Sequence, residues 1–230
     1  MAVRRCLLLF LLLTPGLAFS DAQPRAAFDK HSPQNLRAVG KLIVPGHRLV
    51  AGERLAHQQD CSASLIGPST ILTAWHCLEY YRDLSRDPQF TLANLPGQPA
   101  ISAYRLADGG GMQADWALLR LHSPVRGVPP LPVSAAGTID TGEGLLLAGY
   151  AADEAIGRGG EVLSWQAHCL LTEPRPGQLA SDCVTYKGAS GGPVMTAQGI
   201  VGVISSGDGS SSTYFVPSTR FLSAVRLYRR

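Results

Sequence analysis

The sequence predicts an all-β protein, a sandwich or barrel, that ends in a single helix. From about residue 38 onward, short apolar runs alternate with clusters of Gly, Pro, Ser and Asp. The chain holds 25 glycines and 16 prolines among 230 residues, which suits tight turns and argues against a helical bundle. The strand-like runs cover residues 39–44, 62–66, 70–73, 90–93, 116–121, 144–150, 162–171, 193–195, 200–205 and 213–216.

The first 20 residues have the pattern of a secretory signal. An arginine pair at positions 4–5 precedes an apolar run at 7–13, and small residues follow at Ala18 and Ser20. This run is shorter than the roughly 20 residues that span a bilayer, so cleavage near Asp21 is favoured over a retained anchor. The arginine pair fits a twin-arginine signal only loosely, which favours the ordinary secretory route. We therefore expect a secreted or periplasmic protein without a stable membrane anchor.

One domain is expected after the signal. Residues 21–37 are polar, contain two prolines and predict a mobile arm or a pro-segment. No repeat, low-complexity tract or second linker follows, so residues 38–230 form one two-lobed unit. Proline and serine followed by apolar residues at three- and four-residue steps predict a helix near the C-terminus. The expected parts are a first half at about 38–123, a proline-rich connector at 124–132, a second half at about 133–216 and a helix at 217–228.

The charge of the chain implies no charged partner. Loss of residues 1–20 removes two arginines and no acidic residue, so the formal charge falls from +3 to +1. The arginines at positions 226, 229 and 230 suit the end of a solvated helix better than a nucleic-acid site. We expect a monomer that binds no nucleic acid.

Four cysteines remain after removal of the signal: Cys61, Cys77, Cys169 and Cys183. An even number in an exported chain predicts two disulfides. Three pairings are open, and proximity in the sequence favours Cys61 with Cys77 and Cys169 with Cys183. Neither a Cys-x-x-Cys pair nor a His-x-x-x-His spacing occurs, so we expect no metal and no other cofactor.

Three short motifs, at residues 73–77, 114–119 and 188–193, predict nucleophilic catalysis. They read Thr-Ala-Trp-His-Cys, Ala-Asp-Trp-Ala-Leu-Leu and Gly-Ala-Ser-Gly-Gly-Pro in chain order. A serine hydroxyl is a poor nucleophile until an imidazole takes its proton and a buried carboxylate orients that imidazole. The motifs assign these roles to Ser190, His76 and Asp115. Asp108 is a rival carboxylate, but the glycines that follow it predict a turn, and His57 is expected in a polar surface loop.

These motifs resemble those of the chymotrypsin-like (trypsin-like) serine proteases, and the arrangement is closer to the bacterial secreted branch that includes glutamyl endopeptidases. The resemblance implies two six-stranded antiparallel β-barrels with a C-terminal helix. It also implies an oxyanion hole formed by the amides of Gly188 and Ser190. The order His, Asp, Ser argues against an α/β-hydrolase, in which the serine comes first.

Two residues depart from the family pattern. Ala189 stands where animal digestive members carry an aspartate that pairs with a newly cut N-terminus, so that activation switch cannot operate in the same way. Trp75 replaces a small residue beside the histidine. The departures motivate an alternative, a protease-fold binding protein that cleaves nothing efficiently. The complete set of three catalytic residue types favours a serine endopeptidase that acts on proteins or peptides.

The resemblance also implies where substrate specificity is determined. Val184, six residues before the serine, corresponds to the base of the pocket and argues against Lys or Arg specificity, although Asp182 and Asp208 keep that alternative open. Ile204 stands where glutamyl-specific members have a histidine, so a small or medium apolar side chain is favoured. The strand that pairs with the substrate backbone corresponds to Ser205, Ser206 and Gly207, and the further pocket residues are Thr185, Lys187 and Tyr214.

Overall fold

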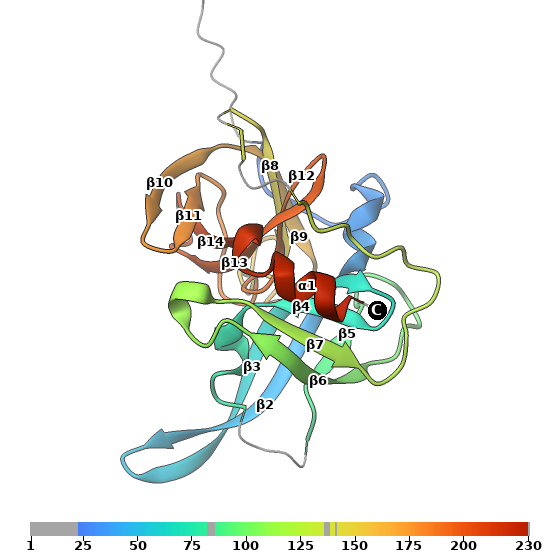
Figure 1. Ribbon diagram of the computed structural model, residues 1–230, viewed down its shortest axis with the longest axis vertical. Coiled ribbons are helices and arrows are strands. Elements are labelled where there is room, and N and C mark those ends of the chain that lie inside the picture. The colour runs from blue at the N-terminus through green and yellow to red at the C-terminus, as the bar shows by residue number, and fades with distance from the viewer. Residues whose placement is uncertain (1–22, 82–85, 136–138, 141, 230) are drawn as a thin grey trace, which may run out of the picture.

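A computed structural model describes residues 23–81, 86–135, 139–140 and 142–229 as two packed β-sheets with short helices (Figure 1). The predicted secretory signal lies outside the described residues. In these ranges no helix combines the length and apolar character needed to cross a membrane. The strands are β1 Ala26–Ala27, β2 Val39–Val50, β3 Glu53–Gly67, β4 Thr70–Thr73, β5 Gln89–Thr91, β6 Ile101–Asp108, β7 Ala117–Leu121, β8 Leu145–Gly149, β9 Ser164–Cys169, β10 Leu171–Arg175, β11 Gln178–Ser181, β12 Pro193–Thr196, β13 Gly199–Gly207 and β14 Thr213–Pro217. The helices are the 3₁₀ turns η1 Gln34–Ala38, η2 Trp75–Leu78, η3 Met112–Ala114 and η4 Ser218–Arg220, and the α-helix α1 Leu222–Tyr228.

The first sheet is a closed six-stranded barrel in the order β2-β3-β4-β7-β6-β5. Strands β2 and β3 pair from Val39↔Ser64 out to Val50↔Glu53, and their far ends project from the barrel as a long hairpin (Figure 1). The apolar run at 39–44 predicts only the inner half of β2. The outer half has few buried side chains and ends in the exposed Leu49 and Val50, so cross-strand hydrogen bonds rather than burial define it.

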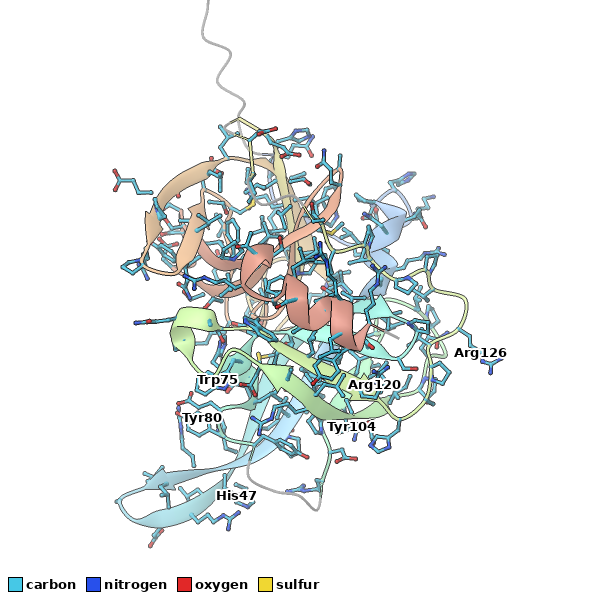
Figure 2. All side chains as sticks on the ribbon, in the orientation of Figure 1. His47, Trp75, Tyr80, Tyr104, Arg120 and Arg126 are labelled. Atoms are coloured by element: carbon cyan, nitrogen blue, oxygen red, sulfur yellow. A yellow bond between two sulfur atoms is a disulfide. The ribbon has the colours of Figure 1, made fainter. Side chains whose placement is uncertain are left out.

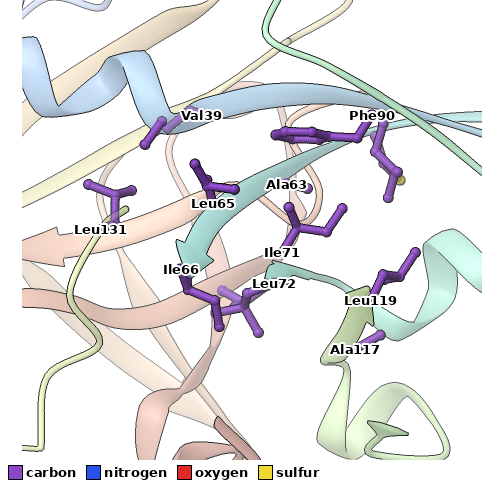
Figure 3. Packing of buried hydrophobic residues seen from close by; sticks show 14 of the residues in the cluster. Val39, Ala63, Leu65, Ile66, Ile71, Leu72, Phe90, Ala117, Leu119 and Leu131 are labelled. Atoms are coloured by element: carbon purple, nitrogen blue, oxygen red, sulfur yellow. The ribbon is translucent and has the colours of Figure 1, made fainter. Parts of the chain in front are cut away.

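The interior of this barrel is filled by aliphatic and aromatic side chains from facing strands (Figure 3). Ile71 of β4 and Leu119 of β7 are paired in register, and both are fully buried, as are Leu65 and Phe90. Each buried side chain of this size contributes about 1.5–3 kcal/mol relative to exposure. The barrel is therefore a rigid support for the loops at its edges.

The second sheet has eight antiparallel strands in the order β1-β9-β8-β12-β13-β14-β11-β10. The all-β architecture with a C-terminal helix is thus confirmed, but this half holds more than the expected six strands. The two additional strands lie at the edges of the sheet. Strand β1 comes from the N-terminal segment, and β10 is exposed apart from its first residue, Leu171, so it has no apolar pattern that could predict it beyond that residue.

The described part of the N-terminal segment packs against the second sheet and is not a mobile arm. Strand β1 pairs with β9 through Ala26↔Trp165. The Trp165 indole Nε1 donates a hydrogen bond to Ser32 Oγ at 3.1 Å, and Leu36 is completely buried. Polarity suggested an exposed arm, whereas backbone pairing and two buried positions hold the segment in place.

The C-terminal helix packs against the first barrel. The predicted helix at 217–228 is a 3₁₀ turn followed by the seven-residue α1, with Phe221 buried between them. Arg120 of β7 donates from Nη2 to the Tyr228 carbonyl at 2.9 Å, beside α1 (Figure 2). Arg229 donates from Nε to the Ile66 carbonyl at 2.6 Å. The chain therefore crosses from the second sheet back to the first.

Candidate active site

Strand pairing in the first barrel brings His76 and Asp115 together. Strands β4 and β7 pair through Thr73↔Ala117. His76 lies in the 3₁₀ turn η2 just after β4, and Asp115 follows η3 just before β7. Because both side chains leave the same end of this pair, they meet at the edge of the barrel.

Asp115 is fully buried and accepts three hydrogen bonds. Its Oδ2 accepts from His76 Nδ1 at 2.8 Å and from the Ser205 hydroxyl at 2.5 Å, and its Oδ1 accepts from the His76 backbone amide at 2.8 Å. An ionised carboxylate only accepts, so Nδ1 carries the hydrogen and the other ring nitrogen of His76, Nε2, is the basic one. The imidazole is therefore held in one orientation and one tautomer. The bond from Ser205 was not expected, since the sequence assigned Ser205 to substrate binding.

The two disulfides have the pairing that sequence proximity favours. Cys61 is bonded to Cys77, directly after His76, and Cys169 is bonded to Cys183. Potential ligand atoms of Cys61, His76 and Cys77 lie within 4.8 Å of one another. The two sulfurs are joined to each other, so they offer no thiolate to a metal ion.

The turn that carries Ser190 depends on glycines pressed against other backbone. Gly188 has φ +88° and Gly191 has φ +83°, both in the left-handed region that favours glycine. A Cβ atom on Gly188 would lie 2.3 Å from the Tyr150 carbonyl oxygen, and one on Gly191 would lie 2.2 Å from the Ser62 carbonyl oxygen. The motif therefore places a sharp turn directly against the first barrel.

Ser190 and His76 line the same cleft, which has a volume of about 650 Å³. The Ser190 hydroxyl donates to the Ser205 carbonyl at 3.3 Å and not to His76, the residue to which the sequence assigns its proton. Without substrate, hydrogen bonds between nucleophile and base are often long and tighten when substrate binds. No backbone hydrogen bond among the described residues engages the amides of Gly188 and Ser190, so neither is committed to another part of the protein.

Ser62 of β3 links the first barrel to this turn and was missed by the sequence analysis. Its hydroxyl donates to the Gly188 carbonyl at 2.7 Å and accepts from the Tyr150 amide at 2.8 Å. Its backbone amide donates to the Ser190 carbonyl at 2.8 Å. Nothing in the sequence identifies it, because a serine within a strand has no motif of its own.

The residues expected to bind substrate fall into different places. Lys187, Ser205, Ser206 and Gly207 line the cleft with Ser190. Tyr214 lies beneath the guanidinium of an arginine of β10, Arg175, which is 3.4 Å from the centre of its ring.

Val184 and Thr185 line a separate cavity of about 10 Å³ beside Ala189 and Arg25. The Thr185 hydroxyl hydrogen-bonds with that of Thr213 at 2.9 Å. The resemblance places Val184 at the base of the specificity pocket, yet in the structure this small cavity is not part of the open cleft.

Asp182 and Asp208, which are close to Val184 in the sequence or to the substrate-binding strand, line neither the cleft nor the small cavity. Asp182 accepts the Leu170 amide at 2.7 Å. Asp208 accepts the amides of the exposed turn at 210–212, and these hydrogen bonds, that of Ser211 first, lower the pKa of its carboxyl. Both lie outside the described linings of the cleft and the cavity, so neither is placed to pair with a Lys or Arg side chain there; the acidic residues that line the cleft are Asp60 and Glu79.

Two residues set aside by the sequence analysis have defined places. Asp108 caps its own turn by accepting the Gly110 amide at 2.9 Å. His57 is not a free surface residue: it is partly buried, contacts the Tyr80 ring edge-on at 5.2 Å between centroids, and lines the cleft. Tyr80 itself lies near the base of the projecting hairpin (Figure 2). The hairpin thus forms one wall of the cleft.

Comparison with known proteins agrees with this geometry. Residues 61–203 match the family model of the trypsin-like peptidase domain. A search of curated proteins finds no match. Among solved structures, that of GrC is 18% identical, with a TM-score of 0.67 over 89% of this chain and 97% of that chain. The protease Anisep from Arthrobacter nicotinovorans is 21% identical, with a TM-score of 0.62 over 85% of this chain and 98% of that one. At these identities the structural likeness shows a common fold.

Proposed function

Because the chain belongs to the trypsin-like peptidase family, we propose that it is an exported serine endopeptidase with Ser190 as nucleophile. His76 acts as general base and then as general acid, and Asp115 orients it. The observation that carries the proposal is the buried Asp115 carboxylate, which holds both the backbone and the ring of His76 at the edge of the cleft that Ser190 lines.

The reaction follows from these positions. Nε2 of His76 takes the Ser190 proton as Oγ attacks the peptide carbonyl, and the buried Asp115 carboxylate stabilises the imidazolium that forms. The amides of Gly188 and Ser190 donate to the oxyanion of the tetrahedral intermediate, where loss of one donor costs about 3–4 kcal/mol. His76 then protonates the leaving amine. Water then attacks the acyl-enzyme: His76 takes a proton from the water and afterwards returns a proton to Ser190 Oγ, which releases the acid product.

A small apolar side chain before the cleaved bond is the preference we propose. An ideal Cβ built on Gly207 would lie 2.2 Å from Thr185 Oγ1, so the strand that pairs with the substrate lies directly against Thr185. Val184 and Thr185 both line the separate small cavity and not the cleft, so we infer that Thr185 closes the approach from the cleft to Val184 and that a small side chain fits best. A long or charged side chain would have to displace Thr185, which is buried and bonded to Thr213.

Export is the proposed setting. The secretory pattern of residues 1–20 and the two disulfides both fit an oxidising compartment outside the cytoplasm. The proposal is therefore a secreted or periplasmic enzyme that acts on proteins or peptides.

Labelling of the exported protein with a fluorophosphonate tests the enzyme function. We expect rapid labelling of the parent at Ser190, and none in the Ser190→Ala variant. Equal behaviour of the two proteins would refute the enzyme and favour the alternative, a binding protein with a protease fold. A peptide library then tests specificity: cleavage after Lys or Arg would contradict the Thr185 argument.

A further inference from the structure

Arg25 is partly buried, with an enclosed side chain, although it belongs to the N-terminal segment that precedes the first barrel. Its side chain is 9% exposed, and its Nη2 forms an ion pair with Asp153, which is 11% exposed. Its guanidinium carbon lies 4.7 Å from the centre of the Tyr186 ring, in cation–π contact. Its Nη1 is buried without a hydrogen-bond partner among the described residues. A buried donor without a partner costs free energy, so stability alone does not explain this placement.

Through Asp153, Arg25 is linked to one side of the catalytic turn, which is the turn at residues 188–191 that carries Ser190. Asp153 also accepts the Ile156 amide at 2.8 Å, which fixes its loop. The residue before it, Ala152, donates its amide to the Lys187 carbonyl at 2.7 Å. Lys187 directly precedes Gly188, whose amide is one of the two proposed oxyanion donors. Two contacts therefore connect Arg25 with that donor: the ion pair with Asp153 and the hydrogen bond between Ala152 and Lys187.

Through Tyr186, Arg25 is also linked to the other side of the catalytic turn, because Tyr186 lies two residues before Gly188 in the chain. The Tyr186 carbonyl accepts the Ala189 amide at 3.1 Å, and this bond closes the turn that presents Ser190. Ala189 is buried and lines the same small cavity as Arg25. Ala189 has no carboxylate, so the acidic partner of the partly buried Arg25 guanidinium is Asp153.

The segment is held in place by contacts that do not involve the Arg25 side chain. Besides the pairing of β1 with β9, the Gln23 amide donates to the Ala167 carbonyl at 3.0 Å and the Phe28 amide donates to the Leu163 carbonyl at 2.7 Å. Substitution of Arg25 should therefore leave the segment docked, so the effect of the side chain can be measured separately.

We propose that Arg25 is a positioning residue that orders the turn bearing the oxyanion donors, through Asp153 on one side and Tyr186 on the other. Residues 23–37 are then a working part of the active enzyme and not a pro-segment that must be removed. This inference rests on the proposed peptidase function.

The test compares Arg25→Ala with Arg37→Ala, which removes an exposed arginine of the same segment. We measure kcat and KM on a short alanine p-nitroanilide peptide, and thermal unfolding confirms that each protein is folded at the assay temperature. Arg25→Ala should lower kcat about 10- to 100-fold with KM changed less than about threefold, because a displaced oxyanion donor acts on the transition state. Arg37→Ala should match the parent. Millimolar methylguanidinium should restore part of the lost kcat, since it can occupy the space beside Asp153 and Tyr186.

Parent-like kcat in folded Arg25→Ala would overturn the inference, as would a loss of kcat that methylguanidinium leaves unchanged. If Arg25→Ala fails to fold, the double variant Arg25→Met with Asp153→Asn, which removes both buried charges, takes its place. A folded double variant with parent-like kcat overturns the inference, and one with the predicted loss supports it. A parent protein that neither cleaves peptides nor reacts with fluorophosphonate would instead refute the proposed function. The two failures are therefore distinguishable.

Discussion

Replacement of Ser62 by alanine should weaken both the fold and the candidate active site, because one hydroxyl joins the two halves of the molecule at the catalytic turn. The hydroxyl donates to the Gly188 carbonyl and accepts from the Tyr150 amide. Ser62 is completely buried. In the alanine variant neither backbone group keeps this partner.

The size of the effect follows from these two bonds. The Tyr150 amide is buried, so leaving it unpaired costs about 1–3 kcal/mol. The Gly188 carbonyl is partly exposed and can recover water, so about 1 kcal/mol is expected there. The total of about 2–4 kcal/mol corresponds to a Tm lower by roughly 4–16 °C for a domain of this size. The kcat should also fall, since the Gly188 carbonyl fixes the backbone next to an oxyanion donor.

Ser64→Ala is the matched control. Ser64 lies two residues further along β3, is 1% exposed, and has a hydroxyl without a hydrogen-bond partner among the described residues. Ser64→Ala removes the same hydroxyl group from the same strand, but it leaves no backbone donor or acceptor without its hydrogen bond. We therefore expect unchanged or slightly higher stability and unchanged kcat. Urea unfolding and kcat of both variants form the assay. Equal losses in the two variants would refute the bridging role of Ser62.

Three further predictions concern other contacts. Replacing Cys61 and Cys77 together by serine opens a link between residues 16 positions apart, and should cost about 3 kcal/mol in urea unfolding; an unchanged midpoint would contradict this. Burial raises the pKa of Asp153, but hydrogen bonds from the Ile156 amide and the Arg25 guanidinium outweigh it, so the pKa lies below the ordinary value of 3.8. The ionised carboxylate therefore stabilises the fold above about pH 4, and this contribution is lost as the pH falls through the lowered pKa. The difference in unfolding free energy between the parent and Asp153→Asn should therefore shrink as the pH falls below about 4, and a constant difference would argue against the sign of the shift. Thr185→Gly should open the approach to Val184 and admit larger side chains in a peptide library; an unchanged cleavage profile would show that Thr185 is not the barrier.

The three candidate catalytic residues were predictable because each lies in a short motif whose order is informative. The β4–β7 pairing then brings two of them together, and only tertiary structure could show the third donor to Asp115, the Ser205 hydroxyl. The sequence assigned Ser205 to substrate binding, whereas its hydroxyl donates to Asp115 and its backbone carbonyl accepts from the Ser190 hydroxyl. A motif identifies a position, but not which atom acts there.

The apolar runs of the sequence missed β1, β6 and β11, most of β10 and the outer ends of β2 and β3. The outer part of the β2–β3 hairpin, which includes Leu49 and Leu55, and most of β10 are exposed, so no regular alternation of buried apolar residues marks them and cross-strand hydrogen bonds define them. Ser62 and Arg25 were missed for another reason. Their partners lie 126 and 128 positions away, and a single sequence does not show such pairs.

The two ends of the described chain pack on opposite halves, and this has a consequence for biosynthesis. The N-terminal segment rests on β9, so it has no docking surface until residues 164–169 have been synthesised. The first barrel, complete in strands by Leu121, still lacks the contacts of Arg120 and Ile66 with the last residues of the chain. Neither the segment nor the barrel completes its packing from its own part of the sequence, so the two halves should fold as one cooperative unit and not one after the other.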